Sequence, residues 1–499
     1  MDERGGKAIE NVEFDVLVVG GGATGVGVAY DAALRGLRTA LFESRDFASG
    51  ASGASTKLLH GGVRYLEKAI FERDYGQYRL VKQALRERDA WIAQAPHLAR
   101  YIPILIPAYS RFQRWYFRAG MRVYDAIAGT SRTTVLNADQ APGRFPALAR
   151  ALAGKPLRGG VIYFDGQFHD ARMAVCVAKA ARDAGALLFN YAEATDFDFD
   201  RKRWHVRIHD KVLDGSYVVR AKTLVNATGP YADVVRRKVS GFSPRLKPSK
   251  GVHFFTDKIQ ISTGLLIPQT SDGRVVFCLP WEGATMVGTT DEFADPTDNR
   301  VQEREIEYLL QQINPYLRQK LTPQDVTGTM VGYRPLVLKS ATARSEALIR
   351  DHEIEVDAKN KAVHVLGGKW TTFRLMAQEA VDRLFLLLDR PFVPCRTLGR
   401  TLNDAIEPES FFRLVSRYRF LPEPTRIHLL RYGKDFEKVL DFAAKDGYAP
   451  LIEGKPFLAA EYEYALRFEW VVKEEDFYFR RLSVGLTEGL KRPTAIPAG

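Results

Sequence analysis

The sequence has few cysteines and no long apolar run. Its 499 residues include only Cys176, Cys278 and Cys395, which lie far apart and form no C-x-x-C pair. This pattern predicts reduced, mostly buried thiols of an intracellular protein and indicates no zinc or other metal site. The apolar stretches at residues 14–19 and 101–109 fall well short of the roughly 20 residues that span a bilayer. We therefore expect neither an export signal nor a membrane-spanning segment.

The sequence also lacks Ser-, Gln- or Pro-rich tracts. We expect a chain folded almost throughout, in two or three domains that share an interface. Its 72 Lys and Arg exceed its 60 Asp and Glu, which gives a formal net charge of +12. Such an excess favours an anionic partner, such as a phosphorylated metabolite, an acidic membrane surface or a nucleic acid. The alternative interpretation is that the excess is simply solvated surface charge.

A nucleotide-binding pattern occupies residues 14–43. A β-branched run typical of a buried parallel strand leads into Gly20, Gly22 and Gly25, spaced G-x-G-x-x-G, and then into a helix. The first glycine permits a tight turn, the second lets a pyrophosphate approach the backbone, and the third packs helix against strand. A second strand closes on Glu43, where a carboxylate accepts hydrogen bonds from ribose hydroxyls, which favours FAD or NAD over NADP.

Two further glycine-containing segments admit two interpretations each. "AKTLVNATGPYAD", residues 221–233, predicts a buried strand that returns to the first sheet, as in flavoproteins, or else a routine strand-to-helix turn. Gly61 and Gly62 of "KLLHGGVRYLE" lack Cβ atoms, so their backbone can lie flat against a planar ring. Alternatively, they form a turn ahead of a long amphipathic helix over residues 64–92.

Several cations stand beside glycines in turns instead of on helical faces. Arg334 and Arg350 flank one such segment, and Lys369 follows a strand and a second diglycine. Cations in such places are better ligand candidates than those on helical surfaces. Thr371 or Thr372 is placed to cap the next helix, whose N-terminus would favour negative charge at a flavin's pyrimidine edge.

These motifs together resemble a known family. "VVGGGATGVGVAYDAALRG", "STKLLHGGVRYLE", "YFDGQFHDARM", "VNATGP", "SKGVHF", "GYRPL", "LIRDH" and "GGKWTTFR" occur in the order found in the FAD-dependent glycerol-3-phosphate dehydrogenases. The resemblance implies an α/β fold with a Rossmann-like FAD-binding domain, an antiparallel-sheet substrate (cap) domain of D-amino-acid-oxidase type and an α-helical C-terminal domain. The expected boundaries are 14–100, 157–240 and 340–392 for the FAD-binding domain, 101–156 and 241–339 for the substrate domain, and 393–499 for the helical domain.

The resemblance also implies a reaction. An aerobic, quinone-linked enzyme of this family would oxidise sn-glycerol 3-phosphate to dihydroxyacetone phosphate by hydride transfer to flavin N5. It would pass the electrons to ubiquinone or menaquinone. The expected location is the cytoplasm, with peripheral contact at the inner face of the cell membrane. No nucleic-acid partner is expected, and a homodimer is left open.

The family pattern assigns roles to individual residues. His253 is the expected base, with Lys369 or Arg64 beside the reacting oxygen. The expected substrate-binding residues are Arg64, Tyr65, Arg334, Arg350 and Lys369. The expected FAD-binding residues are Gly20, Gly22, Ala23, Thr24, Gly25, Glu43, Ser55, Thr56, Lys57, Leu59, His60, Gly61, Gly62, Gly229, Gly368, Lys369, Thr371 and Thr372.

Membrane contact and rival functions remain as alternatives. Residues 111–129 place arginines on one helical stripe and aromatic residues on the next, which suits a helix lying on an anionic bilayer. The sequence slightly favours the other interpretation, a core-facing helix with a solvated basic edge. The rival functions are a glycerol-3-phosphate oxidase that uses oxygen, a flavoenzyme acting on an amino acid or another 2-hydroxy acid, and a flavin-containing nucleic-acid-binding protein.

Overall fold

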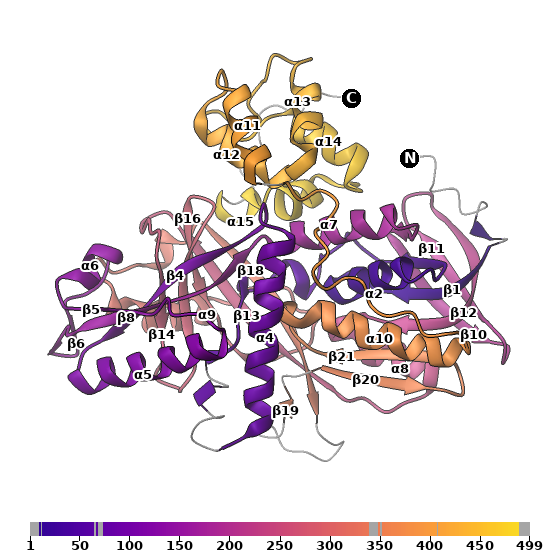
Figure 1. Cartoon of the computed structure of the whole chain (residues 1–499), viewed down its shortest axis with the longest axis horizontal. Helices are drawn as coiled ribbons and strands as arrows, with labels where there is room; N and C mark the ends of the chain where they lie inside the picture. The colour runs from indigo at the N-terminus through magenta and orange to yellow at the C-terminus, as the bar shows by residue number, and fades with distance from the viewer. Residues whose placement is uncertain are drawn as a thin grey trace.

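The protein combines two sheet-based domains with a helical C-terminal domain (Figure 1). The computed structural model describes residues 9–10, 12–63, 66–67, 73–338, 348–349, 352–406 and 408–488. Three expected site residues, Arg64, Tyr65 and Arg350, lie outside the described residues. None of the helices within the described ranges has the length and apolar character required to cross a membrane.

The first domain is built on an eight-stranded mixed sheet. Strand β1 pairs in parallel with β2 on one side and with β12 on the other, and β12 pairs in parallel with β21. The prediction that the segment around residue 221 returns to the first sheet is therefore confirmed. The strands are β1 (Glu13–Val19), β2 (Thr39–Phe42), β9 (Leu187–Phe189), β10 (Ala192–Phe199), β11 (Trp204–Asp210), β12 (Gly215–Asn226), β20 (His352–Asp357) and β21 (Ala362–Gly367).

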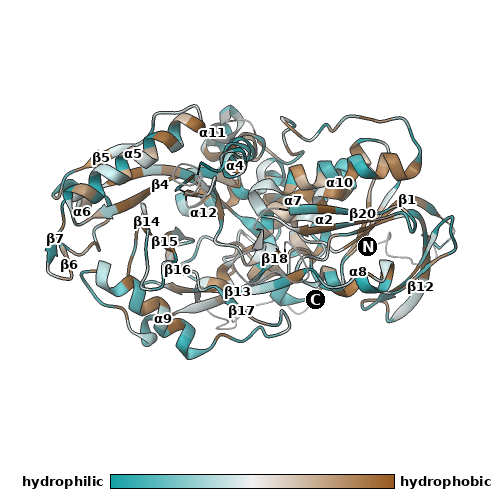
Figure 2. Ribbon diagram, turned by 90° about the horizontal axis from the view of Figure 1, so that it is seen from below, coloured by the Kyte–Doolittle hydropathy of each residue, from teal (hydrophilic) through white to brown (hydrophobic). Residues whose placement is uncertain are grey.

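Helices cover both faces of this sheet. Helices α2 (Ala23–Leu34), α7 (Asp170–Asp183) and α10 (Phe373–Leu388) share one apolar core with the side chains that β1 presents to that face. Helix α8 (Ala232–Ser240) contributes to a separate core with the alternate residues of β1. Figure 2, in which apolar residues are brown, shows them concentrated along strands such as β1 in the interior.

The second domain is built on an eleven-stranded, mainly antiparallel sheet. Its strands are β3 (Leu58–Leu59), β4 (Ala99–Ala108), β5 (Thr134–Leu136), β8 (Gly159–Phe168), β13 (Leu246–Thr256), β14 (Gly264–Ile267), β15 (Val276–Trp281), β16 (Ala284–Gly288), β17 (Glu292–Phe293), β18 (Gly328–Leu338) and β19 (Leu348–Ile349), beside a β6–β7 hairpin (Ala151–Leu152 and Lys155–Pro156). The expected boundary at residue 157 needs correction. Strand β8, assigned in advance to the FAD-binding domain, pairs along its whole length with β4 in this second sheet.

Four helices belong to the second domain, and one differs from expectation. They are α4 (Tyr75–Gln94), α5 (Arg111–Ile127), α6 (Gln140–Arg144) and α9 (Glu303–Ile313). A continuous helix over residues 64–92 is not formed. Arg73 has a left-handed backbone (φ 52°), and Asp74 caps α4 by accepting a hydrogen bond from the Gln77 N–H at 3.2 Å. The hydrophobic periodicity on both sides of this break hid it in the sequence.

The C-terminal part is helical, as predicted, and stands above α7 in Figure 1. Its elements are α11 (Pro408–Arg417), α12 (Glu423–Leu429), η8 (Leu430–Asp435), α13 (Phe436–Ala443), α14 (Ala460–Phe468), the π-helical turn η9 (Asp476–Arg481) and α15 (Val484–Glu488). Buried ion pairs attach it to the FAD-binding domain. Arg481 makes two bonds to Asp46 at 2.8 and 2.9 Å, and Arg172 of α7 binds Glu469.

Candidate functional site

The glycine-rich turn between β1 and α2 has the geometry that a dinucleotide needs. Gly20 has φ +105°, and a Cβ there would lie 2.7 Å from the Ala227 carbonyl oxygen. A Cβ on Gly25 would lie 1.8 Å from the Gly20 carbonyl oxygen, so this glycine allows α2 to pack against the turn. Gly22 is the N-cap of α2, whose first free N–H groups are a natural anion site.

Two polar side chains complete the turn. The Ala23 N–H donates to Ser52 Oγ at 2.9 Å, and this bond fixes the loop of residues 49–56 over the start of α2. Glu43, just after β2, accepts hydrogen bonds from the Gly21 N–H at 2.6 Å and the Arg45 N–H at 2.9 Å. The Ser44 hydroxyl also donates to Oε1 of this carboxylate at 3.3 Å. These bonds orient the carboxylate, and Oε2 keeps a second lone pair for a ribose hydroxyl.

A cavity of about 900 Å³ extends from this turn to the sheet of the second domain. It brings together residues from widely separated parts of the chain. Its volume suits a large cofactor plus a small substrate. The expected site residues that line it are Gly20, Gly22, Ala23, Thr24, Glu43, Ser55, Thr56, His60, Gly229, His253, Arg334, Gly368, Lys369 and Thr371.

Other expected FAD-binding residues face elsewhere. Lys57 is buried and pairs with Asp170 at 2.7 Å, so its side chain holds the loop 53–57 against α7. Gly61 and Gly62 are not among the residues that line the cavity, and their expected contact with a ring stays a prediction. A Cβ on Gly61 would collide with Leu85 and with the hydroxyl of Tyr124, which accepts the Gly61 N–H. Gly25, Leu59 and Thr372 are likewise not among the residues that line the cavity.

Arg334 and His253 lie on neighbouring strands at the substrate-domain end of the cavity. The guanidinium of Arg334 on β18 lies 3.1 Å from a carboxylate oxygen of Asp291 and donates to Thr289 Oγ1 at 3.2 Å. About a third of this side chain (32%) is exposed, so it is held in place but accessible from the cavity. Bidentate cations of this kind suit phosphate.

His253 on β13 is buried, and its Nε2 lies 3.0 Å from Thr56 Oγ1. Burial, together with the charges of Arg334 and Lys57, lowers the pKa of His253 to about 3, so the imidazole is neutral. Gly288 leaves room for the ring, because a Cβ there would lie 2.2 Å from its Cδ2 atom. A neutral imidazole next to cations is able to accept a proton.

The turn after β21 supplies a third part of the site. Gly367 and Gly368 have φ values of 72° and 91°, and they lead through Lys369 into η7 (Trp370–Thr372) and α10. Lys369 also acts on His60. The pKa of His60 is lowered to about 4, chiefly by burial and further by the positive charges of Lys369 and Arg88.

The expected cap of α10 is corrected in detail. Thr372 occupies the N-cap position but makes no side-chain capping bond, while Thr371 Oγ1 accepts the His60 N–H at 3.2 Å. Thr371 therefore joins two segments of the cavity wall.

Sequence reasoning missed several supporting residues. Ser52 positions the glycine-rich turn, and Asp291 and Thr289 position Arg334. The Trp370 Nε1–H donates to the Ser52 carbonyl at 2.7 Å. Residues 49–56 are all serine, glycine, alanine or threonine, and this composition does not indicate which hydroxyl faces the helix. The partners of Arg334 have no local sequence signal, because they lie over 40 positions away.

The chain matches two family descriptions along almost its whole length. Residues 15–383 match the family described as FAD dependent oxidoreductase, and residues 395–498 match the family described as C-terminal domain of alpha-glycerophosphate oxidase. The residues around the cavity fit the cofactor named by the first description, because the Gly22 position has no Cβ to obstruct a pyrophosphate and Glu43 faces the ribose position.

Individual proteins show the same similarity. The mitochondrial glycerol-3-phosphate dehydrogenase of Arabidopsis thaliana is 38% identical over 503 residues, which cover 95% of this chain and 80% of that protein. The human mitochondrial glycerol-3-phosphate dehydrogenase is 36% identical, over 97% of this chain and 69% of that protein. The solved structure of glycerol-3-phosphate dehydrogenase from Bacillus halodurans complexed with FAD superposes with a TM-score of 0.76 at 29% identity, covering 96% of this chain and 88% of that one.

Proposed function

The chain belongs to the FAD-dependent glycerol-3-phosphate dehydrogenase family, and we propose that it oxidises sn-glycerol 3-phosphate to dihydroxyacetone phosphate and passes the electrons to a membrane quinone. One observation supports this proposal most strongly. A dinucleotide-binding turn lines the same cavity as Arg334, Lys369 and His253. A dianionic three-carbon phosphate needs cations at one end, and oxidation of its secondary alcohol needs a proton acceptor at the other.

The chain's own residues divide this work. Arg334, oriented by Asp291 and Thr289, binds the phosphate. Lys369 stabilises negative charge that develops on the reacting oxygen, and His253 accepts the hydroxyl proton at Nε2 or Nδ1. When bound, FAD supplies a hydride acceptor at N5. Arg64, Tyr65 and Arg350 stay assigned to substrate binding by family resemblance.

The pH profile tests the lowered pKa of His253. Below its pKa the imidazole is protonated and cannot act as a base, whereas above it the neutral ring is competent. Because the pKa of His253 is lowered to about 3, protonation of this imidazole should not reduce kcat/KM between about pH 8 and pH 5. A histidine with the ordinary pKa of about 6.5 would cost about tenfold per pH unit below that value.

The measurement is kcat/KM against pH, corrected for the substrate phosphate, which takes up a proton near about pH 6. The variant His253→Gln provides the comparison, since it has no titrating group at this position. An acid limb near about pH 6.5 that is present in the parent and absent in His253→Gln would contradict the lowered pKa of His253.

Delivery of electrons to a quinone requires contact with a membrane, and α5 is the element we propose for it. The aromatic stripe of this helix faces outward, since Phe112 is 70% and Trp115 is 64% exposed. Arg111, Arg118 and Arg122 are exposed beside them. The sequence had slightly favoured a core-facing helix, but only Met121, Tyr124 and Asp125 of α5 are buried. Exposed aromatics beside arginines suit an anionic bilayer surface.

Substitution of this stripe should weaken membrane binding. Burial of each large apolar side chain contributes roughly 1.5 to 3 kcal/mol, so the double variant Phe112→Ser/Trp115→Ser should bind anionic vesicles at least about tenfold more weakly. The measurement is sedimentation with phosphatidylserine-containing vesicles. Leu386→Ser is the matched control, because Leu386 is 72% exposed on α10, in the other domain. Equal binding by parent, double variant and control would exclude α5.

Oxygen is the alternative electron acceptor. The match of residues 395–498 to the C-terminal domain of an alpha-glycerophosphate oxidase favours it as a second candidate. Turnover of glycerol 3-phosphate in air without added acceptor distinguishes the two reactions. Stoichiometric hydrogen peroxide would identify an oxidase, whereas a turnover that depends on added quinone analogue supports the dehydrogenase.

A further inference from the structure

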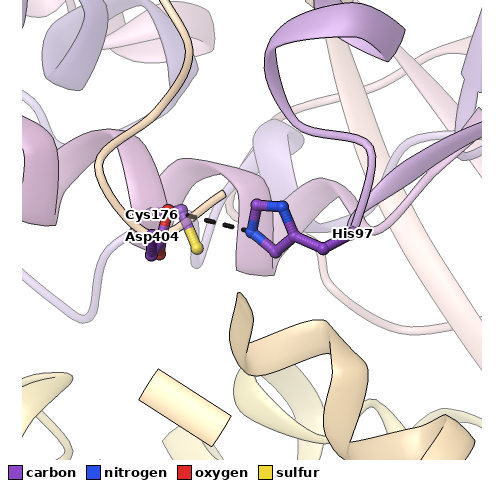
Figure 3. A group of neighbouring side chains, drawn as sticks. All are labelled: His97, Cys176 and Asp404. Atoms are coloured by element: carbon purple, nitrogen blue, oxygen red, sulfur yellow. Dashed lines mark ion pairs between the residues drawn. The ribbon is translucent and has the colours of Figure 1, made fainter. Parts of the chain in front are cut away.

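A second group of chemically active side chains lies away from the cofactor cavity. His97 comes from the loop between α4 and β4, Cys176 from the middle of α7, and Asp404 from the segment that leads into the C-terminal domain. Their ligand atoms all lie within 4.8 Å of one another, and His97 Nε2 is 3.8 Å from Asp404 Oδ1. Figure 3 shows the histidine ring facing the other two side chains.

Three buried polar atoms of this group have no hydrogen-bond partner in the described part of the chain. Among the described residues, neither ring nitrogen of His97 makes a hydrogen bond, and Asp404 Oδ1 makes none either, although these atoms are buried. The His97 side chain is 0% exposed. Buried polar atoms are normally paired, and leaving them unpaired destabilises the fold. One ring nitrogen of His97 and one carboxylate oxygen of Asp404 lie together with the thiol of Cys176, which suggests that something binds between them.

The surrounding charges leave room for a cation. Lys179 lies 3.4 Å from Asp404 Oδ2 and 2.7 Å from Asp435, and Arg172 pairs with Glu469. Each of these cations therefore already has a carboxylate, and Lys179 orients Asp404 through the oxygen that the group does not use.

We propose that His97, Cys176 and Asp404 bind one zinc ion. Thiolate, imidazole and carboxylate together match the borderline-soft Zn²⁺ better than Mg²⁺ or Ca²⁺, which take oxygen ligands. Binding replaces the S–H bond of Cys176 with a Zn–S bond and releases the proton to solvent. His97 also lines a second cavity, of about 870 Å³.

The ion would connect three parts of the fold. Asp404 is held to the C-terminal domain by its own carbonyl oxygen, which accepts the Lys434 N–H at 2.9 Å. Leu402 N–H donates to the Gln94 carbonyl at 3.1 Å, beside His97. Cys176 belongs to the helix layer of the FAD-binding domain. A zinc ion at this place would fasten the C-terminal domain to both other domains, and so it would act on stability rather than on electron transfer.

The test is zinc content measured by elemental mass spectrometry on tag-free holoenzyme. The protein is dialysed against zinc and then against metal-free buffer. We expect about one zinc per chain in the parent and essentially none in Cys176→Ala, a loss of affinity of at least about 100-fold. Cys278→Ala is the matched control, because Cys278 is also a buried free thiol but belongs to no such group. It should keep its zinc.

Flavin content of each variant reports on folding, because the proposed metal ligands do not line the cofactor cavity. If Cys176→Ala loses flavin, His97→Gln takes its place in the same measurement. Added zinc should also raise the thermal unfolding midpoint of the parent and of Cys278→Ala but not of Cys176→Ala or His97→Gln. A zinc-free parent after dialysis, or zinc bound equally by parent and both ligand variants, would overturn the proposal.

Discussion

Replacement of Gly22 with valine is expected to give a protein that purifies without FAD and has no dehydrogenase activity. A Cβ at this position would lie 2.9 Å from Ser52 Oγ, and the two valine methyl groups would project into the space in front of the α2 N-terminus. The pyrophosphate needs that space to reach the free N–H groups. We expect the affinity for FAD to fall on the order of 100-fold or more. Visible absorbance per mole of purified protein is the measurement.

Gly120→Ala is the control for this prediction. Gly120 lies in α5, and a Cβ there would meet nothing within 4 Å, so the substitution changes a glycine without crowding any neighbour. This variant should remain yellow and active. A Gly22→Val protein with the parent's flavin content would show that the cofactor does not use the turn between β1 and α2.

Replacement of Arg334 with alanine is expected to lower kcat/KM for glycerol 3-phosphate by about 30-fold to several thousandfold. This range corresponds to the roughly 2 to 5 kcal/mol that loss of a charged, hydrogen-bonded contact costs. Arg334→Lys should fall between alanine and the parent, because it keeps the charge but loses the planar fork held by Asp291 and Thr289. Steady-state kinetics with a soluble quinone analogue gives the values.

Two comparisons make the Arg334 result specific. Arg304→Ala removes an arginine of the same domain that is 68% exposed and does not line the cavity, so its kinetics should match the parent. Glycerol without the phosphate should be oxidised equally poorly by the parent and by Arg334→Ala. If Arg334→Ala stayed within a few fold of the parent for glycerol 3-phosphate, Arg334 would have no role in phosphate binding.

The nucleotide-binding half of the site was predictable because its signals are local. The strand, the three glycines, the helix and Glu43 lie within 30 consecutive residues, and each has a backbone reason for its position. The return of β12 to the same sheet was also predictable, since a buried β-branched run before Ala-Thr-Gly is typical of a parallel strand.

Other features depend on contacts that the sequence does not encode locally. Strand β8 is almost fully buried, so its composition does not distinguish a strand of one sheet from a strand of the other. Leu85 and Tyr124, from two different helices, fill the space into which a Cβ on Gly61 would point, and no signal near this glycine in the sequence indicates them. The helical periodicity of α5 was visible, whereas the face it exposes is set by packing on the second sheet.

The most direct test of the central claim is an anaerobic titration of the purified protein with glycerol 3-phosphate while the flavin absorbance is recorded. We predict that the oxidised flavin band disappears in proportion to added substrate and that dihydroxyacetone phosphate forms in equal amount. A yellow, folded protein whose flavin band stays unchanged under excess glycerol 3-phosphate would contradict the account.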